Sequence, residues 1–291
     1  MIIELILVFL GLIGLIIAVY SDFKTTEIPD WLSYSLIITA ISLRAFNSLA
    51  YNNLLYIKIA VINLIIFFII GNIMFYSKQW GGGDVKLLMA LSVIFATYPE
   101  FLLKFFSPIL DINFPLIIFI NTLMVGCIYS MILTIYKSIK NRKEFLKQFK
   151  TYLVKTSSLR KIVLILSILL IILSIIITNI YLKIIIFFSS LSILFLLYSW
   201  IYLKSVEKSC MYKVMKLNEL REGDWITKDI YKNKNLILKI PRYGITKQEI
   251  NLLKKYKINE VEIKQGIIFT PSFLIATILS LIFGDLLAYI I

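Results

Sequence analysis

The opening stretch of the sequence decides the fold class. Residues 2–22 read IIELILVFLGLIGLIIAVYSD, and residues 2–20 form an apolar run in which Glu4 is the only charged residue. A run of about 20 apolar residues is long enough to cross the hydrocarbon core of a bilayer as a helix. Asp22 follows this run, so a carboxylate stands where a predicted membrane helix reaches water.

The rest of the chain repeats this pattern. Hydrophobic residues make up 59% of the 291 positions and charged residues only 16%. Further apolar runs cover residues 31–50, 54–76, 85–97, 114–136, 162–178, 180–203 and 268–291. We therefore predict a polytopic α-helical membrane protein with about eight spans. The run at 85–97 is the shortest, and the runs within 162–203 form an apolar hairpin around Asn179.

Lysine and arginine set the expected orientation. Residues 138–161 form a strongly basic segment after the fifth run, and such segments stay on the cytoplasmic side. With alternating spans, Asp22, Asp84 and residues 204–267 then also face the cytoplasm, and the first span is uncleaved with its start outside. The expected division is a membrane bundle at 1–203, a small domain at 204–267 and a last span at 268–291.

Residues 204–267 change in composition and predict a small cytoplasmic α+β domain. Residues 235–240 and 261–263 alternate as strands do. Thr246 and Glu249 form a capping-box pattern that opens a helix reaching Tyr256. No residue pattern in this domain indicates catalysis.

The net charge of +14 does not indicate nucleic-acid binding. The basic residues flank the membrane runs, where orientation and anionic lipids require them, so the bilayer is the expected partner. Within the basic segment, Phe145, Phe149 and Tyr152 recur at helical spacing with lysines between them. This spacing predicts a helix lying in the membrane interface, with a solvated loop as the alternative.

The absence of histidine restricts the chemistry. The chain has no His, so neither a His-Glu-x-x-His zinc site nor a Ser-His-Asp or Cys-His arrangement is available. Cys127 and Cys210 lie in different segments, are expected to be free thiols and form no Cys-x-x-Cys motif. We therefore predict no metal and no cofactor, which leaves paired carboxylates as the route to hydrolysis.

Asp22 and Asp84 are the predicted pair. Asp84 closes the run Gly81-Gly82-Gly83-Asp84 directly before an apolar run. Two neighbouring carboxyls do not both ionise easily, so one holds a proton while the other activates water. The three glycines predict a bare backbone edge with unusual φ values, against which an extended substrate lies.

Each aspartate also has a structural interpretation. Asp84 follows glycines and precedes a helix, as an ordinary N-cap does. Asp22 follows the carboxyl end of a helix, where the helix dipole disfavours an anion, so its position has a local cost. The functional interpretation depends on both aspartates lying on one side of the membrane at one depth.

Two motifs carry a family resemblance. Residues 22–30, DFKTTEIPD, together with 81–86, GGGDVK, resemble the signatures of archaeal preflagellin and type IV prepilin peptidases, which are Gly-x-Gly-Asp membrane aspartyl proteases. The resemblance implies removal of a short basic leader from preflagellin or pilin-like precursors at the cytoplasmic face. It places Asp22 and Asp84 as the catalytic pair and gives Lys24 and Lys86 supporting roles. The cysteine cluster of the bacterial enzymes is missing, so we expect no methyltransferase activity.

Recognition of a basic leader by a basic protein requires local acids. Glu27 and Asp30 beside the first motif, and Glu222 and Asp224 in the small domain, are the predicted leader contacts.

Two other functions fit parts of the pattern. A presenilin-like or signal-peptide-peptidase-like enzyme shares Gly-x-Gly-Asp and cuts inside the bilayer, but this chain has no Pro-Ala-Leu before its last run. A transporter or assembly scaffold would use the aspartates to bind cations or cap helices, and Asp285 in the last run would suit it. Cleavage of a precursor with a short basic leader separates the three.

Overall fold

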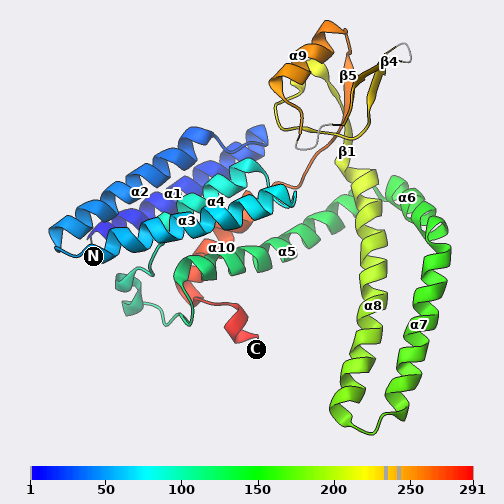
Figure 1. Cartoon of the computed structure of the whole chain (residues 1–291), viewed down its shortest axis with the longest axis horizontal. Coiled ribbons are helices and arrows are strands. Elements are labelled where there is room, and N and C mark those ends of the chain that lie inside the picture. The colour runs from blue at the N-terminus through cyan, green and yellow to red at the C-terminus, as the bar shows by residue number, and fades with distance from the viewer. Residues whose placement is uncertain (1, 233–234, 241–243, 291) are drawn as a thin grey trace. The chain divides into compact units, whose positions relative to one another are not determined.

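The computed structural model describes residues 2–232, 235–240 and 244–290. The chain forms two compact units. The first comprises Met1–Met131 with Ile267–Ile291, and the second comprises Ile132–Gly266. Figure 1 labels the elements of both units.

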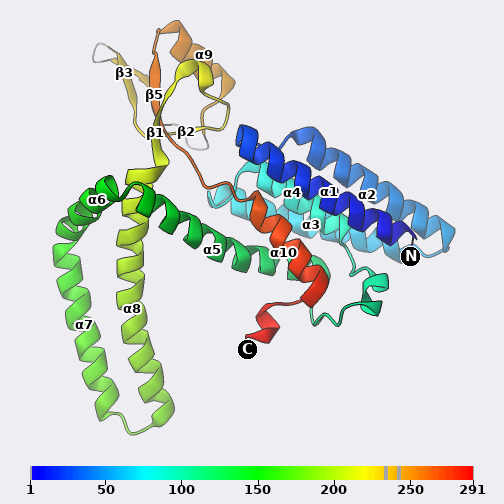
Figure 2. The same ribbon diagram turned by 180° about the vertical axis from the view of Figure 1, so that it is seen from behind.

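The first unit is a helical bundle. Its helices are α1 (Ile2–Thr25), α2 (Asp30–Ala50), α3 (Leu55–Tyr76), α4 (Gly82–Ile94), η1 (Glu100–Lys104), the first part of α5 (Phe114–Lys140) and α10 (Thr270–Phe283). Helix α4 packs on α2 and α3, while α1 packs on α2 and α10. Figure 2 shows α10 beside α1 and the first part of α5, although α10 follows them by more than a hundred residues.

Local features of the sequence determine where these helices begin and end. Thr26 adopts a φ of 55° and its N–H donates to the Asp22 carbonyl at 2.8 Å, which closes α1 with a left-handed residue. Pro271 stands in the first turn of α10, where its missing N–H has no cost. Gly284 ends α10 with a φ of 75°, and a Cβ there would stand 2.1 Å from the Ile109 carbonyl oxygen.

Close packing holds the bundle together. Phe67, Leu87, Leu88 and Phe273 are almost completely buried in its core. Gly71 lets α4 approach α3, since a Cβ there would lie 2.5 Å from Val85 Cγ1. In a bilayer, the fit between such surfaces contributes more to helix association than the hydrophobic effect does.

Six helices of the described chain are long and apolar enough to cross a membrane. They are Ile2–Thr25, Asp30–Ala50, Leu55–Tyr76, Phe114–Lys140, Ser157–Ile176 and Ile180–Met211. The two remaining expected spans are shorter helices: α4 has 13 residues and α10 has 14. Helix α4 stops at Ile94, ahead of Pro99, and α10 stops at Gly284. The expected count of about eight spans is therefore not confirmed.

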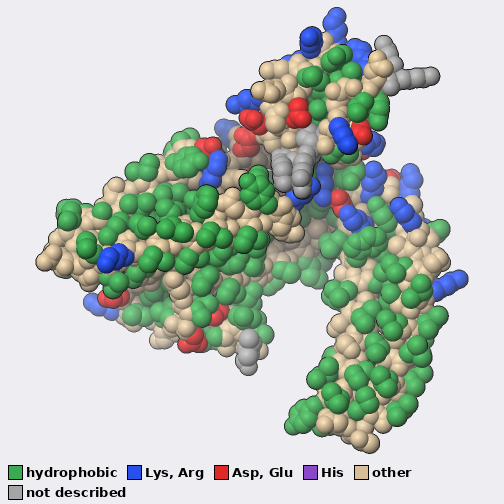
Figure 3. Space-filling view, viewed as in Figure 1, with side chains coloured by type: hydrophobic (Ala, Val, Ile, Leu, Met, Phe, Trp, Pro, Cys, Tyr) green, Lys and Arg blue, Asp and Glu red, His purple; other side chains and the backbone are tan. Residues whose placement is uncertain are grey.

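In the second unit, α7 (Ser157–Ile176) and α8 (Ile180–Val206) pack on each other as a helical hairpin. Asn179 caps α8 by accepting hydrogen bonds from the N–H groups of Tyr181 and Leu182. Figure 3 shows hydrophobic side chains over the outer surface of this hairpin. Ile176, for example, is 71% exposed, as lipid-facing residues are when no lipid is present.

Helix α6 (Arg142–Lys155) carries the basic segment. Its Phe145 ring lies 5.6 Å from the Tyr202 ring, and its Tyr152 ring lies 6.4 Å from the Trp200 ring. The expected helix forms, but part of its aromatic face packs on α8 rather than being left entirely to the membrane interface. The spacing of aromatic residues identified the apolar face without identifying what covers it.

The end of the second unit contains the strands. An antiparallel sheet has the order β1 (Tyr212–Lys216), β5 (Glu260–Lys264), β2 (Trp225–Ile226), and β3 (Ile230–Lys232) pairs with β4 (Asn235–Leu238). Strands β4 and β5 lie where the alternation predicts them. Helix α9 (Lys247–Lys255) confirms the capping box, with Thr246 and Glu249 bonded to each other. Leu253 and Val261 belong to a separate small core.

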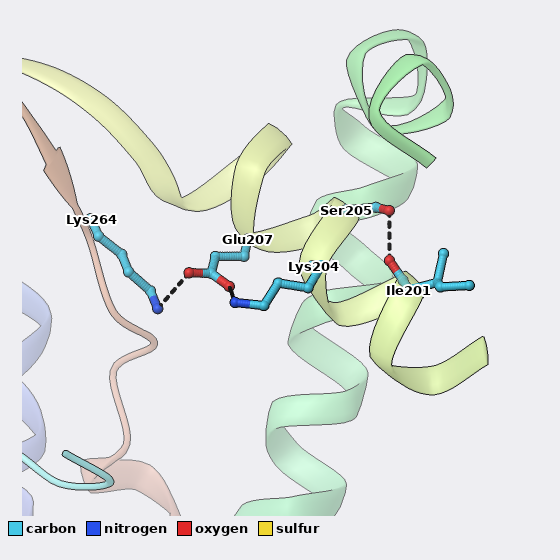
Figure 4. A network of polar contacts seen from close by, with 5 residues as sticks. All are labelled: Ile201, Lys204, Ser205, Glu207 and Lys264. Atoms are coloured by element: carbon cyan, nitrogen blue, oxygen red, sulfur yellow. Dashed lines mark hydrogen bonds and ion pairs between the residues drawn. The ribbon is translucent and has the colours of Figure 1, made fainter. Parts of the chain in front are cut away.

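A charged contact joins α8 to the sheet within the second unit. Glu207, directly after α8, pairs with Lys204 at 2.9 Å and with Lys264 of β5 at 2.8 Å (Figure 4). In the preceding turn, the Ser205 hydroxyl donates to the Ile201 carbonyl at 2.6 Å. One carboxylate therefore links the end of the helix to β5.

Candidate active site

Asp22 lies in the last turn of α1 and is 8% exposed. Its Oδ2 accepts a hydrogen bond of 2.8 Å from the hydroxyl of Thr270, the first residue of α10. The expectation that Asp22 follows the first helix is wrong, because α1 continues to Thr25. The Thr25 hydroxyl donates to the Ser21 carbonyl, which supports this added turn.

Asp84 lies in the first turn of α4. Its Oδ2 accepts a hydrogen bond of 3.1 Å from the backbone N–H of Gly81. This contact is one half of a capping box, and glycine has no side chain to supply the other half. Asp84 is therefore not the N-cap that its position in the sequence suggested: Gly81 is the N-cap of α4, and Asp84 supports it from the third helical position.

The environment of Asp84 favours its protonated form. Asp84 lies outside the six candidate spans. Its removal from water raises its pKa to about 7, against the lowering effect of the Gly81 N–H. The negative charge of Asp22 raises this pKa further. Among the described residues no hydrogen bond joins the two carboxyls, which have separate partners in Thr270 and Gly81.

The glycine run does not adopt the backbone conformation that was expected of it. Gly81 has a φ of −75°, and none of Gly81, Gly82 and Gly83 adopts a positive φ. The expectation of unusual φ values is therefore wrong. Space explains Gly83 instead, because a Cβ atom there would lie 3.1 Å from Cβ of the buried Ile28. The lack of side chains lets the segment after α1 approach the start of α4.

Aromatic rings connect the glycine run to α10. Trp80 is 9% exposed and contacts the rings of Phe119, Phe269 and Phe273, with centroids 5.9, 5.6 and 5.2 Å away. The Phe269 ring also covers Gly126 of α5, where a Cβ would stand 2.3 Å from it. These contacts hold the residue before Gly81 against the residue before Thr270.

Trp80, Phe269 and Thr270 are not among the site residues predicted from the sequence. Two local signals were available: a tryptophan directly before a glycine run, and Thr270-Pro271 at the start of an apolar run. Neither signal identifies its spatial partner.

The two predicted supporting lysines, Lys24 and Lys86, differ from each other in their contacts. Lys86 Nζ lies 2.5 Å from Asp30 Oδ1, which joins α4 to the first residue of α2, and also lies over the Tyr34 ring. Lys24 is exposed and lies 5.8 Å from the centroid of the Tyr20 ring. Only Lys86 therefore bridges two of the segments that carry the motifs.

The four predicted leader contacts fall in both units. Glu27 and Asp30 are exposed in the first unit, where Asp30 is engaged by Lys86. Glu222 and Asp224 belong to the second unit: Glu222 pairs with Lys247 at 3.4 Å, and Asp224 accepts from the Arg221 N–H at 2.7 Å. Of these four acids, only Glu27 has a carboxylate with no hydrogen-bond or ion-pair partner among the described residues.

Asp285 does not take part in this site. It follows the carboxyl end of α10, whereas Thr270 begins that helix. Its Oδ1 accepts a hydrogen bond from the Leu287 N–H, as a turn-forming aspartate does.

Comparison with known proteins shows what the segment that contains these residues is similar to. Residues 9–134 match the model of the type IV leader peptidase family, and this stretch contains both Asp22 and Asp84. The resemblance drawn from the two motifs is thus confirmed.

Individual relatives are archaeal. A preflagellin peptidase of Methanococcus voltae is 30% identical over 145 residues, covering 48% of this chain and 60% of the relative. A preflagellin peptidase of Methanocaldococcus jannaschii is 29% identical over 159 residues, covering 50% and 66%. The prepilin peptidase EppA of Methanothermobacter thermautotrophicus is 28% identical over 155 residues, covering 51% and 40%. These matches span about half of this chain and less than two thirds of each relative. No solved structure matches the chain.

Proposed function

We propose that this chain is a membrane aspartyl endopeptidase that removes the short basic leader from preflagellin or pilin-like precursors at the cytoplasmic membrane face. The observation that carries the proposal is that the two motif segments meet in the first unit, where Gly83 packs against Ile28, and that their aspartates, Asp22 and Asp84, both lie within the stretch that matches the leader peptidase family. The names of the relatives give the substrate class.

In the proposed reaction, the two carboxyls share one proton. The ionised carboxylate takes a proton from water, and the protonated one donates a hydrogen bond to the scissile carbonyl. Because the carboxyls of the free enzyme have separate partners, Thr270 and Gly81, a bound substrate strand would bring them together while excluding water. The glycine run is the proposed edge for that strand.

The proposed topology keeps the catalytic pair cytoplasmic. Helices α4 and α10 are too short to count among the six candidate spans, but both pack in the bundle that contains three of those spans and the first part of α5. We assign residues 85–97 and 268–291, which include most of α4 and all of α10, as the additional spans that bring the number to about eight, with Asp84 directly before the first of them. The proposed division remains a bundle at 1–203, a cytoplasmic domain at 204–267 and a last helix within 268–291.

Leader recognition is proposed to begin at the first motif. Glu27 is exposed and acidic, and Asp30 becomes available when Lys86 releases it. A leader lysine or arginine would compete with Lys86 for the Asp30 carboxylate. Glu222 and Asp224 are proposed as secondary contacts.

The test is cleavage of a purified precursor with a short basic leader. Asp22→Asn and Asp84→Asn should each abolish cleavage, because an amide keeps the volume but neither takes nor gives the proton. Asp111→Asn, at an exposed aspartate outside both motifs, is the control and should retain activity. Mass spectrometry of the product locates the cut, and a cut within the apolar segment would favour the intramembrane alternative. Measurable cleavage by either site variant would overturn the assignment.

A further inference from the structure

Among the described residues of the first unit, the hydrogen bond between Asp22 and Thr270 joins the two side chains that lie farthest apart in the sequence. It joins residues 248 positions apart, and both ends are buried: Asp22 is 8% exposed and Thr270 is 0% exposed. A hydroxyl that donates to a carboxylate favours its ionised form and fixes the direction of one oxygen. The bond uses Oδ2 of Asp22 and therefore ties one oxygen of this carboxylate to the start of α10.

The position of Thr270 is itself fixed. Phe269, the preceding residue, lies against Gly126 of α5 and against Trp80 beside the glycine run. Thr270 is the first residue of α10, so the Asp22 carboxylate lies at a helix N-terminus, where the helix dipole stabilises an anion. The start of α10 is therefore packed against the segment that leads to Asp84 while its hydroxyl holds Asp22.

We propose that Thr270 is a positioning residue that holds the Asp22 carboxylate in the orientation from which it acts with Asp84. This inference rests on the proposed function. A buried hydroxyl on α10 does not always form a hydrogen bond to another helix, so the bond from Thr270 to Asp22 is not a mere consequence of burial. Thr277 is 0% exposed, and its hydroxyl has no hydrogen-bond partner within the described chain.

Other ionisable groups around α1 must be considered when the pH dependence is interpreted. Helix α10 carries no ionisable side chain between Thr270 and Phe283. Electrostatic interaction with Asp22 is found for Asp84 on α4 and Tyr129 on α5. Arg44 and Glu100 act on Glu4, near the other end of α1. The remaining groups on elements packed against α1, or on α1 itself, are Lys86, Asp30, Tyr34, Lys104, Tyr20 and Lys24.

The experiment compares Thr270→Val, Thr270→Ser and Thr277→Val in the full-length enzyme with a purified precursor over a range of pH. Thr270→Val removes the donor at nearly constant volume and should lower kcat about 10- to 100-fold with little change in KM. Because the ionised form of the carboxyl pair then loses a hydrogen bond, the limb of the pH profile on which the pair loses its first proton should move to higher pH. Thr270→Ser keeps the donor and should restore both readouts, while Thr277→Val should match the wild type.

Each outcome decides the inference. An unchanged pH profile in folded Thr270→Val, or a Thr270→Ser variant as impaired as Thr270→Val, overturns the positioning role. If Thr270→Val does not fold, Thr270→Ala replaces it under the same criteria. If Asp22→Asn remains active, the proposed function is wrong, and the positioning role of Thr270 is wrong for the same reason. If Asp22→Asn and Asp84→Asn are inactive but Thr270→Val behaves as the wild type, only this inference fails.

Discussion

Gly83 and Ile28 are in close contact: a Cβ atom on Gly83 would stand 3.1 Å from Ile28 Cβ. Ile28 belongs to the short connection between α1 and α2, and Gly83 lies in the first turn of α4. The contact therefore joins the segment that follows Asp22 to the segment that contains Asp84. The spacing of these two segments depends on the absence of one methyl group.

The first prediction uses this spacing. Gly83→Ala should lower the rate of precursor cleavage about tenfold, because Ile28 must shift by a few tenths of an ångström and small misplacements of reacting groups slow catalysis. Gly266→Ala is the control and should keep the wild-type rate, because a Cβ there would meet no atom within 4 Å and Gly266 lies outside the glycine run. Equal rates for the two variants would contradict the role of the contact.

The second prediction concerns pH and stability. The pKa of Asp84 is raised from 3.8 to about 7, so folding disfavours its ionised form. This destabilisation is absent below pH 3.8, grows as the pH rises and is complete above about pH 7. Asp84→Asn should therefore raise the apparent Tm in detergent at pH 8 and change it little at pH 4. An equal change at both pH values would contradict the raised pKa, and Asp111→Asn controls for the lost charge.

The third prediction concerns Lys86 and Asp30. The pair is short but partly exposed, with 30% and 63% of the two side chains accessible. A double-mutant cycle with Lys86→Gln and Asp30→Asn should give a coupling of about 1 kcal/mol or less in the free energy of unfolding, as exposed ion pairs do. Lys86→Gln should weaken cleavage without abolishing it. Complete loss of activity would reassign Lys86 to the catalytic machinery.

The fourth prediction tests the proposed orientation. In a chain with Cys127 and Cys210 replaced by serine, single cysteines at Thr25, Lys143 and Glu222 should react with a membrane-impermeant maleimide only from the cytoplasmic side. The basic segment predicts this side, because segments rich in lysine and arginine stay on the cytoplasmic side. Labelling of the Thr25 position from outside would place Asp22 on the wrong face.

The fifth prediction concerns metal removal. EDTA should leave the cleavage rate unchanged, because the proposed reaction uses only two carboxyls and a water molecule. A zinc-dependent control protease in the same detergent shows that the chelator is effective. Inhibition that added zinc or magnesium reverses would contradict the aspartyl mechanism.

Local patterns in the sequence determined much of this protein. A run of about 20 apolar residues predicts a membrane helix without reference to any other part of the chain, so the long helices follow from local composition. The capping box at Thr246 predicted α9 for the same reason, since its partners lie three residues apart. The complete lack of histidine left carboxylates as the available catalytic groups, and the two motifs selected Asp22 and Asp84.

Tertiary packing decided the features that local patterns do not encode. The hydrogen bond from Thr270 to Asp22 spans 248 residues and exists because α10 packs on α1. The Trp80 rings contact α5 and α10 for a similar reason, and Gly83 is required by Ile28 rather than by its own φ. Hydrophobicity and capping act over a few residues, whereas the surroundings of a buried carboxyl are set by whichever distant helix covers it. The sequence therefore determined which groups perform the proposed chemistry, and the packing of the helices decided which residues hold them.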